Sequence, residues 1–214
     1  LRVVDHLENY LPLLKHTKAP DTMDFISKIG KMHVNVSNIE TASTKTSKVV
    51  QALKNYSHVQ SSDRLVETDL KESLETVLTI FHNQTKYGVE VDTEYGKVPP
   101  VMVYPDEIGQ VWTNIIQNGI QAMKGEGTLK IHTSLDGDYA RVDIGDSGSG
   151  IPEDIQERIF DPFFTTKGQG EGTGLGLDIT RKIVEKHHGE ISVESEPGNT
   201  VFTILLPLES KIEE

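Results

Sequence analysis

The sequence predicts an α+β protein in two parts, a helical hairpin over residues 1–66 and a layered α/β domain over residues 67–214. The first part has a single glycine and repeats aliphatic residues at three- and four-residue spacings, which is typical of paired helices. The second part mixes the helical period with strand-like alternation, which favours helices packed on antiparallel strands. It also holds most of the 18 glycines, so tight turns are concentrated there.

The hairpin is predicted from an apolar seam along its longer second arm. Nine positions between Asp24 and Val59 alternate spacings of four and three residues, and seven of them are apolar. They are Phe25, Ile29, Met32, Val36, Ile39, Ser43, Thr46, Val50 and Leu53. A shorter first arm repeats the spacing from Val4 to Leu14, and residues 18–21 break the helix between the arms. Because a hairpin cannot bury one seam alone, we expect a homodimeric four-helix bundle; the alternative is a single long helix packed on the second part.

The α/β part is predicted element by element from its periodicity. Three segments have the helical period, residues 70–81, 106–123 and 175–188, and Gly189 ends the last of them. The strand-like segments are residues 89–91, 101–103, 129–133, 140–144, 191–193 and 202–206. Turns at residues 136–137 and 196–199 join the last four strands into two hairpins. We therefore expect helices grouped against antiparallel hairpins.

Composition and charge argue against several classes of function. The 33 acidic residues against 21 basic ones give a formal charge of −12, which disfavours sequence-independent binding to nucleic-acid phosphates. The chain has no cysteine, which excludes disulfides, thiolate metal sites and cysteine nucleophiles, and the simplest compartment is the cytoplasm. No apolar run approaches the roughly 18 residues of a membrane span, and no signal peptide opens the chain. Because the chain begins at Leu1, we expect it to be a fragment of a longer protein.

Helix 106–123 carries a stripe of amide side chains beside its predicted core-facing residues. The core-facing residues are Ile108, Val111, Ile115 and Ala122. Gln110, Asn114 and Asn118 lie four residues apart on an adjacent face. Asparagine is a poor helix former, so the stripe requires an explanation. Buried structural amides are one explanation, and a site for Mg²⁺, which Asn oxygens can ligate, is the other.

Two glycine-containing loops carry the remaining candidate ligand-binding residues. Asp146-Ser147-Gly148-Ser149-Gly150 follows a strand, and its carboxylate can accept from an exocyclic amine while the glycines admit a flat ligand, although an ordinary turn has the same composition. Residues 160–167, Phe-Asp-Pro-Phe-Phe-Thr-Thr-Lys, lead into five glycines at every second position. Backbone N–H groups of such a loop can bind phosphates at a helix N-terminus, and Lys167 adds a cation. The loop is neither a P-loop nor a Rossmann fingerprint, since the spacing and the preceding strand are lacking.

The order of these segments, over about residues 68–208, resembles the catalytic ATP-binding domain of sensor histidine kinases in the GHKL ATPase superfamily. The resemblance implies an α/β sandwich of the Bergerat type that binds ATP and Mg²⁺. It also implies roles for single residues. Asn114 and Asn118 match the N box, with Asn118 as the Mg²⁺ ligand, and Asp146, Gly148 and Gly150 match the G1 box, with Asp146 reading the adenine amino group.

The resemblance extends through the glycine-rich loop to the last strand. Phe163 lies in the segment that matches the F box, followed by Lys167, and the G2 box that forms the ATP lid spans Gly172, Thr173, Gly174, Leu175 and Gly176. Thr200 is implied to bind adenine through water. One position departs from the pattern: Gln121 stands where many relatives have a basic residue that meets phosphate, and Lys167 and Lys124 are the candidates to replace it.

Residues 1–62 resemble the dimerisation and phosphotransfer hairpin of the same kinases, but the usual acceptor pattern is lacking. That pattern is a histidine followed directly by an acidic residue and by a proline five residues on. His6 is followed by Leu7, with Glu8 second and Pro12 sixth, and it is nonetheless the best candidate acceptor. The acceptor can also lie upstream of Leu1 or be absent.

The resemblance therefore implies an ATP-dependent protein-histidine kinase. It would phosphorylate a histidine and pass the phosphoryl group to an aspartate of a response regulator receiver domain that docks on the hairpin. A noncatalytic, dimeric ATP-binding switch without an acceptor histidine is the alternative. An ATPase or protein-serine kinase of the superfamily is a further one, which the heptad hairpin disfavours.

Overall fold

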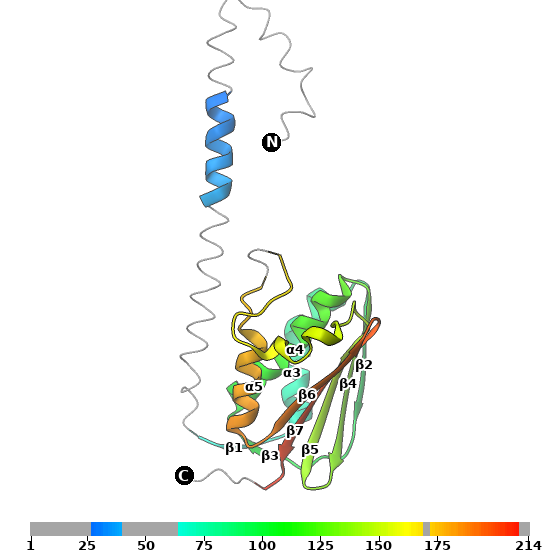
Figure 1. Ribbon diagram of the computed structural model, residues 1–214. Helices are drawn as coiled ribbons and strands as arrows, with labels where there is room; N and C mark the ends of the chain where they lie inside the picture. The colour runs from blue at the N-terminus through cyan, green and yellow to red at the C-terminus, as the bar shows by residue number, and fades with distance from the viewer. Residues whose placement is uncertain (1–26, 40–63, 169–171, 210–214) are drawn as a thin grey trace, which may run out of the picture. The chain divides into compact units, whose positions relative to one another are not determined.

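The computed structural model describes residues 27–39, 64–168 and 172–209 (Figure 1). The chain divides into two compact units, Leu1–Val50 and Gln51–Glu214. A division into domains at residues 66 and 67 stays a prediction. Within the described ranges, no helix has both the length and the hydropathy to span a membrane.

The described part of the first unit is an α-helix over residues 27–39, within the predicted second arm. Four seam residues lie on it, and their exposed fractions run from 47% to 68%: Ile29, Met32, Val36 and Ile39. Their 3-4-3 spacing places them on one side of the helix. An exposed apolar stripe of this kind is a surface that another helix can cover. The bundle itself stays a prediction, and the other seam positions and the first arm lie outside the described residues.

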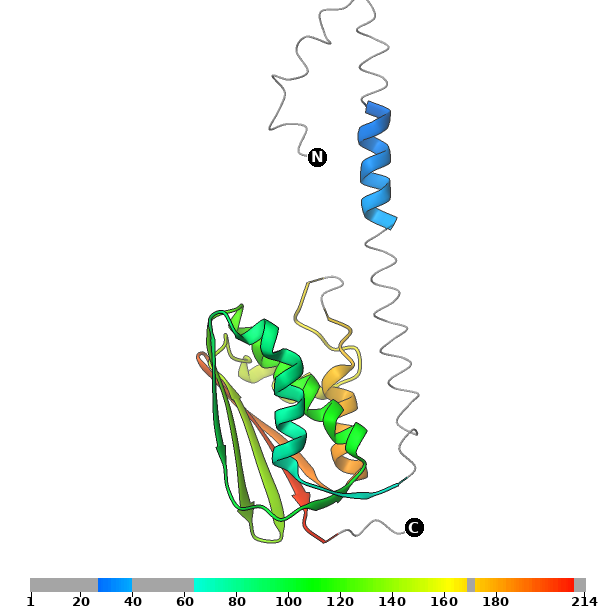
Figure 2. The same cartoon turned by 180° about the vertical axis from the view of Figure 1, so that it is seen from behind.

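The second unit is built on a mixed five-stranded sheet in the order β2-β4-β5-β7-β6 (Figures 1 and 2). Its strands are β2 (Val89–Tyr95), β4 (Gly127–Asp136), β5 (Tyr139–Asp146), β6 (Glu190–Glu196) and β7 (Asn199–Pro207). The pair β2 and β4 is parallel, and the other neighbouring pairs are antiparallel. A small antiparallel sheet pairs β1 (Val66–Thr68) with β3 (Val101–Val103).

Three helices cover one face of the large sheet, and its other face is open (Figures 1 and 2). They are α3 (Leu70–Thr85), α4 (Pro105–Met123) and α5 (Gly176–Lys186). The central helix, α4, packs against both other helices and against β4 and β5. Its buried apolar residues are Ile108, Val111, Trp112, Ile115, Ile116, Ile120 and Met123. Because α4 is buried on most sides, residues at its C-terminal end are held rigidly beside the ends of the strands.

The predicted helices and strands of the α/β part are confirmed to within a few residues at their ends. Asp69 caps α3, since its Oδ1 accepts from the backbone N–H of Lys71 at 2.8 Å and of Glu72 at 3.3 Å. Strand β1 and the 3₁₀-helices η2 (Glu153–Ile155) and η3 (Arg158–Phe160) were not predicted, because each has only three residues. Ala122 is half-buried rather than part of the core, because it faces the turn after β5.

Candidate nucleotide-binding site

Asn114 joins α4 to the beginning of α5. Its Nδ2 donates to the carbonyl oxygen of Gly176 at 2.9 Å and to Thr180 Oγ1 at 3.2 Å. This tertiary contact explains one mid-helix asparagine structurally. It also holds the N-terminus of α5 beside α4, and no side chain caps that terminus. The first backbone N–H groups of a helix lack partners within the helix, so this terminus can receive an anion.

Asn118 lies one turn further along α4 and presents its amide oxygen to a cation. Asn118 Oδ1 accepts from Lys167 Nζ at 2.9 Å, and Gln121 Oε1 accepts from the same ammonium group. Partial burial lowers the pKa of Lys167. An amide oxygen that faces positive charge suits Mg²⁺, whereas no group of three acidic or histidine ligands occurs in the described ranges. The donor set therefore fits a Mg²⁺ ion that is bound together with phosphates.

Asp146 ends β5 on the sheet face that α4 covers. The residue is 8% exposed, and one carboxylate oxygen accepts from the Gly148 N–H at 2.8 Å. Burial raises the pKa of the Asp146 carboxyl, and the hydrogen bond from Gly148 acts in the opposite direction. A Cβ added at Gly119 would lie 3.1 Å from the Asp146 Cβ. Because Gly119 has no side chain, the Asp146 side chain can pack directly against α4.

The glycines after Asp146 allow close backbone packing. A Cβ at Gly148 would lie 2.6 Å from Asp146 Oδ1 and 2.7 Å from the Cβ of Ala122, so a side chain there would collide with both. Gly150 has φ +76°, and a Cβ there would lie 2.6 Å from the carbonyl oxygen of Glu196. Both predicted glycines are therefore required by geometry in this turn.

Thr200 lies opposite Asp146 in the pairing of β5 with β7. It is 3% exposed, and its Oγ1 is 2.7 Å from Ser195 Oγ, which accepts from the Ile151 N–H at 2.8 Å. The hydroxyl of Thr200 is therefore part of a short hydrogen-bond chain that joins the turn after β5 to the β6–β7 hairpin. This places Thr200 and Asp146 together, as the resemblance implies.

The glycine-rich loop begins with phenylalanines in different environments. Phe160 is buried and Phe164 is half-buried, whereas Phe163 is 71% exposed and has φ +65°. It is the backbone of Phe163 that makes the close contact: a Cβ added at Gly174 would lie 2.3 Å from the Phe163 carbonyl carbon. The two limbs of the loop therefore meet at Phe163 and Gly174.

The rest of the G2 segment leads into α5. A Cβ at Gly172 would lie 2.8 Å from Thr165 Oγ1. Thr173 Oγ1 accepts from the Leu175 N–H at 3.4 Å, and the Leu175 side chain is buried in the core. Gly176 is the first residue of α5 and faces Asn114. Residues 169–171 and the candidate acceptor His6 lie outside the described residues.

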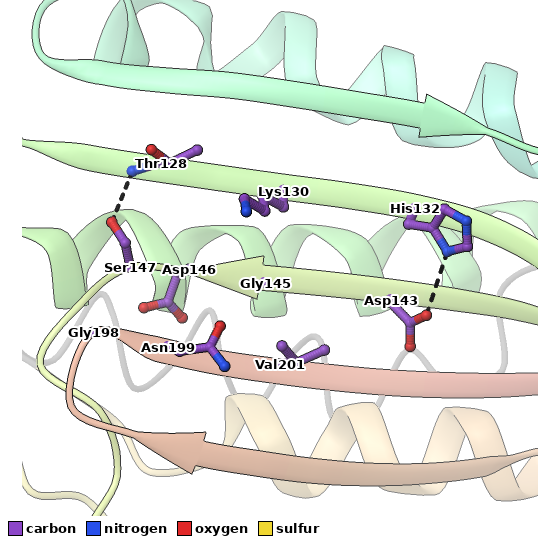
Figure 3. Close-up of a pocket in the computed structure, with 10 residues that line it drawn as sticks. All are labelled: Thr128, Lys130, His132, Asp143, Gly145, Asp146, Ser147, Gly198, Asn199 and Val201. Atoms are coloured by element: carbon purple, nitrogen blue, oxygen red, sulfur yellow. Dashed lines mark hydrogen bonds and ion pairs between the residues drawn. The ribbon is translucent and has the colours of Figure 1, made fainter.

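A pocket of about 320 Å³ lies on the open face of the sheet (Figure 3). Lys130 and His132 of β4 line it together with Asp143 and Gly145 of β5. Among the predicted site residues, Asp146 alone contributes to its lining, from the end of β5. None of the other predicted site residues within the described ranges lines it, so this pocket is not the site that the sequence predicts.

The polar residues of the candidate site were predicted from the sequence, and two residues that pack against them were not. The contacts of Gly119 with Asp146 and of Ala122 with Gly148 were not predicted. A Cβ at Gly119 would lie 3.1 Å from the Asp146 Cβ, and a Cβ at Gly148 would lie 2.7 Å from the Ala122 Cβ. The one available signal was the four-residue step from Asn114 through Asn118 to Ala122, which places Ala122 on the site side of α4.

A family model described as histidine kinase-, DNA gyrase B- and HSP90-like ATPase matches residues 104–210. Sporulation kinase E of Bacillus subtilis is 43% identical over 119 residues, which cover 55% of this chain and 16% of that protein. The sensory histidine kinase/phosphatase NtrB of Rhodobacter capsulatus is 40% identical over 129 residues, 53% of this chain and 35% of that protein. The match thus spans about a third or less of these curated relatives.

A solved structure extends the similarity. The histidine kinase ThkA, in complex with response regulator protein TrrA, matches with a TM-score of 0.68 and 26% identity, covering 97% of this chain and 65% of that chain. The matches agree with the fold of the α/β domain.

Proposed function

This chain belongs to the histidine kinase-, DNA gyrase B- and HSP90-like ATPase family, and on that premise we propose that it is the ATP-binding core and dimerising hairpin of a sensor histidine kinase. The relatives that match it are named as kinases and histidine kinases. The proposed reaction transfers the γ-phosphoryl group of ATP to a histidine and then to an aspartate of a response regulator. The solved complex of ThkA with TrrA supports the choice of partner class.

One observation carries the proposal: two chemically different ends of a nucleotide site lie along the same stretch of α4. Asp146 is buried against Gly119 and can accept from an adenine amine. Asn118 and Lys167 supply an oxygen ligand and a cation, and the open N-terminus of α5 supplies backbone donors, as phosphates require.

The proposed mechanism depends on positioning, because phosphoryl transfer needs little covalent chemistry from the protein. Mg²⁺, when bound, neutralises charge on the phosphates, and Asn118 is the residue that would hold it. Asp146 and Thr200 fix the base, Asn114 holds α5 in place for the phosphates, and Lys167 places positive charge near them. The glycine-rich loop covers the nucleotide and excludes water.

The acceptor histidine is the open part of the proposal. His33 lies on the described helix 27–39 and is exposed, but Val34 rather than an acidic residue follows it. His6 keeps its place as candidate acceptor from the sequence. A specific observation, the lack of any histidine with the usual acidic neighbour in residues 1–62, favours the second candidate function, a dimeric ATP-binding switch without phosphotransfer.

The test is to incubate the chain with γ-labelled ATP and Mg²⁺ and to measure the stability of the bound label. Acid-labile, base-stable label that disappears in His6→Ala is the expected result for phosphohistidine at that site. Binding of ATP without label would support the switch, and acid-stable label would indicate a serine or threonine kinase. An unlabelled protein that does not bind ATP would contradict both candidates.

A further inference from the structure

Lys167 connects the glycine-rich loop to the amide stripe of α4. Its ammonium group lies 2.9 Å from Asn118 Oδ1 and donates to Gln121 Oε1 as well. These two residues are three apart on α4 and therefore lie on one face, so a single ammonium group reaches both. Charge-assisted hydrogen bonds are the stronger class in proteins. Lys167 thus fastens its loop to the helix.

The contact holds both limbs of the loop rather than one side chain. Thr165 Oγ1 accepts from the Lys167 N–H at 3.2 Å, which shapes the limb that carries the lysine. A Cβ at Gly172 would lie 3.3 Å from Lys167 Cδ, so the returning limb packs on the lysine stem. The closely packed backbones of Phe163 and Gly174 join the limbs again at the base. Release of Lys167 from α4 would therefore free both limbs together.

The same oxygen has two candidate cations. Asn118 Oδ1 accepts from Lys167 in this structure, and under the proposed function it is the oxygen that ligates Mg²⁺. An ammonium group and a divalent ion repel one another at that separation and cannot share the oxygen. Gln121 Oε1 is a second acceptor on which Lys167 can stay after Asn118 is taken.

We propose that Lys167 occupies Asn118 until Mg²⁺ and nucleotide displace it, and that Gln121 is the positioning residue that keeps Lys167 at the phosphate end of the site. This rests on the proposed function. Gln121 stands where many relatives, by the resemblance, carry a basic residue. A basic side chain there would repel Lys167, whereas a neutral amide oxygen accepts from it. Lys167, on the loop, thereby supplies the positive charge that a basic residue at position 121 would supply in those relatives.

Lys124, the other candidate from the sequence, does not have this contact. It follows the last residue of α4 in a left-handed conformation with φ 54°, and its backbone N–H donates to the Gln121 carbonyl oxygen at 3.3 Å. Within the described part of the chain, no hydrogen bond or ion pair joins the Lys124 side chain to the side chain of Asn118 or Gln121. It is an exposed lysine close in sequence to the site, so Lys124→Gln is a matched control for Lys167→Gln.

The experiment measures the affinity of the protein for ADP with and without Mg²⁺. The quantity compared between variants is the affinity with Mg²⁺ divided by the affinity without it. In Lys167→Gln the ratio should rise about tenfold, because the ion loses a competitor for Asn118 and replaces a lost positive charge. Lys124→Gln should keep the wild-type ratio. A purely structural role for Lys167 would lower both affinities together and leave the ratio unchanged, and that result would overturn the proposal.

The role of Gln121 is tested by hydrogen exchange of residues 163–168, measured by mass spectrometry. Gln121→Leu should speed exchange several-fold both in the free protein and in the Mg²⁺–ADP complex, while Gln121→Glu, which keeps an acceptor oxygen, should restore slow exchange. Equal exchange in all variants would contradict the positioning role. A wild-type protein that binds no ADP would instead contradict the proposed function, so the two failures are distinguishable.

Discussion

At the scale of single residues, the site depends on the buried carboxyl group of Asp146. Within the described ranges, the only hydrogen bond to the Asp146 carboxylate is that from the Gly148 N–H, and burial raises the pKa of this group. A buried carboxylate with one hydrogen bond destabilises the fold, and a ligand that donates a hydrogen bond to it offsets this cost. Its position after a strand was predictable, but the contact of its Cβ with Gly119 was not, because 27 residues and two strands separate them.

Replacing Asp146 with Asn keeps the size of the side chain and removes the charge. We expect ATP affinity to fall by about 2 to 3 kcal/mol, roughly 30- to 150-fold, since an amine loses a charged acceptor. The melting temperature should stay level or rise, because a buried charge is removed. Titration calorimetry and thermal unfolding measure the two effects. Asp136→Asn, at an exposed end of β4, is the control, and equal affinity in both variants would contradict the role of Asp146.

His187 makes the stability of the fold depend on pH. Its Nδ1 lies 2.7 Å from the Ile183 carbonyl oxygen and its Nε2 accepts from the Tyr104 N–H at 3.0 Å, so the neutral ring satisfies both contacts. Burial lowers the pKa of His187. The unfolded chain therefore binds the proton more readily than the folded protein does. The stability that the neutral, buried His187 ring contributes is complete above its unfolded pKa of about 6.5 and is lost as the pH falls through its lower folded pKa.

Denaturant unfolding between pH 7.5 and pH 5 tests this. The wild-type free energy of unfolding should decrease as the pH falls below about 6.5. His187→Leu should cost about 1 to 3 kcal/mol at pH 7.5, because the Tyr104 N–H loses its acceptor, and should flatten the dependence over this range. An equally steep decrease in the variant would assign the effect to another group.

At the scale of elements, helices and strands followed from periodicity, while the loops did not. The amphipathic pattern of residues 70–81 was sufficient for α3, and the alternation of residues 129–144 was sufficient for the β4–β5 hairpin. The path of the glycine-rich loop could not be predicted, because its contacts are with α4, more than 40 residues earlier in the chain. Glycine spacing indicated a loop but not which backbones it brings together.

Two glycines with similar backbone angles allow the cost of a left-handed backbone to be distinguished from the cost of a steric clash. Gly174 has φ +66° and would place a Cβ 2.3 Å from the Phe163 carbonyl carbon, whereas Gly137 has φ +59° and nothing within 4 Å. Gly137→Ala should cost only the left-handed backbone, about 1 to 2 kcal/mol. Gly174→Ala should in addition displace the loop and lower ATP affinity at least tenfold in a binding titration. If both variants bind ATP equally, the loop does not depend on this contact.

At the scale of the whole molecule, the proposed function requires both an ATP site and a dimer. The sequence pattern predicted the seam, and the described helix carries four of its residues exposed. What covers them could not be predicted from one chain, because a heptad pattern indicates a partner helix without saying which chain provides it.

Charge on the seam should separate the chains. Met32→Glu places a carboxylate on the apolar stripe and should shift a dimer to monomer in sedimentation, with ATP binding by the second unit retained. Asn35→Glu adds the same charge at an exposed position outside the stripe and serves as the control. A monomeric wild type would contradict the bundle, and a dimer that survives Met32→Glu would place the interface elsewhere.

We propose that Asn118 and its neighbours form a Mg²⁺-dependent ATP site on α4. The most direct measurement is the ATP affinity of the wild type, Asn118→Ala and Gln117→Ala by titration calorimetry, each with and without Mg²⁺. Gln117 is the exposed neighbouring amide on the same helix. We predict that Mg²⁺ strengthens ATP binding at least tenfold in the wild type and in Gln117→Ala, and that Asn118→Ala loses this gain. Unchanged Mg²⁺-dependent affinity in Asn118→Ala would contradict the account.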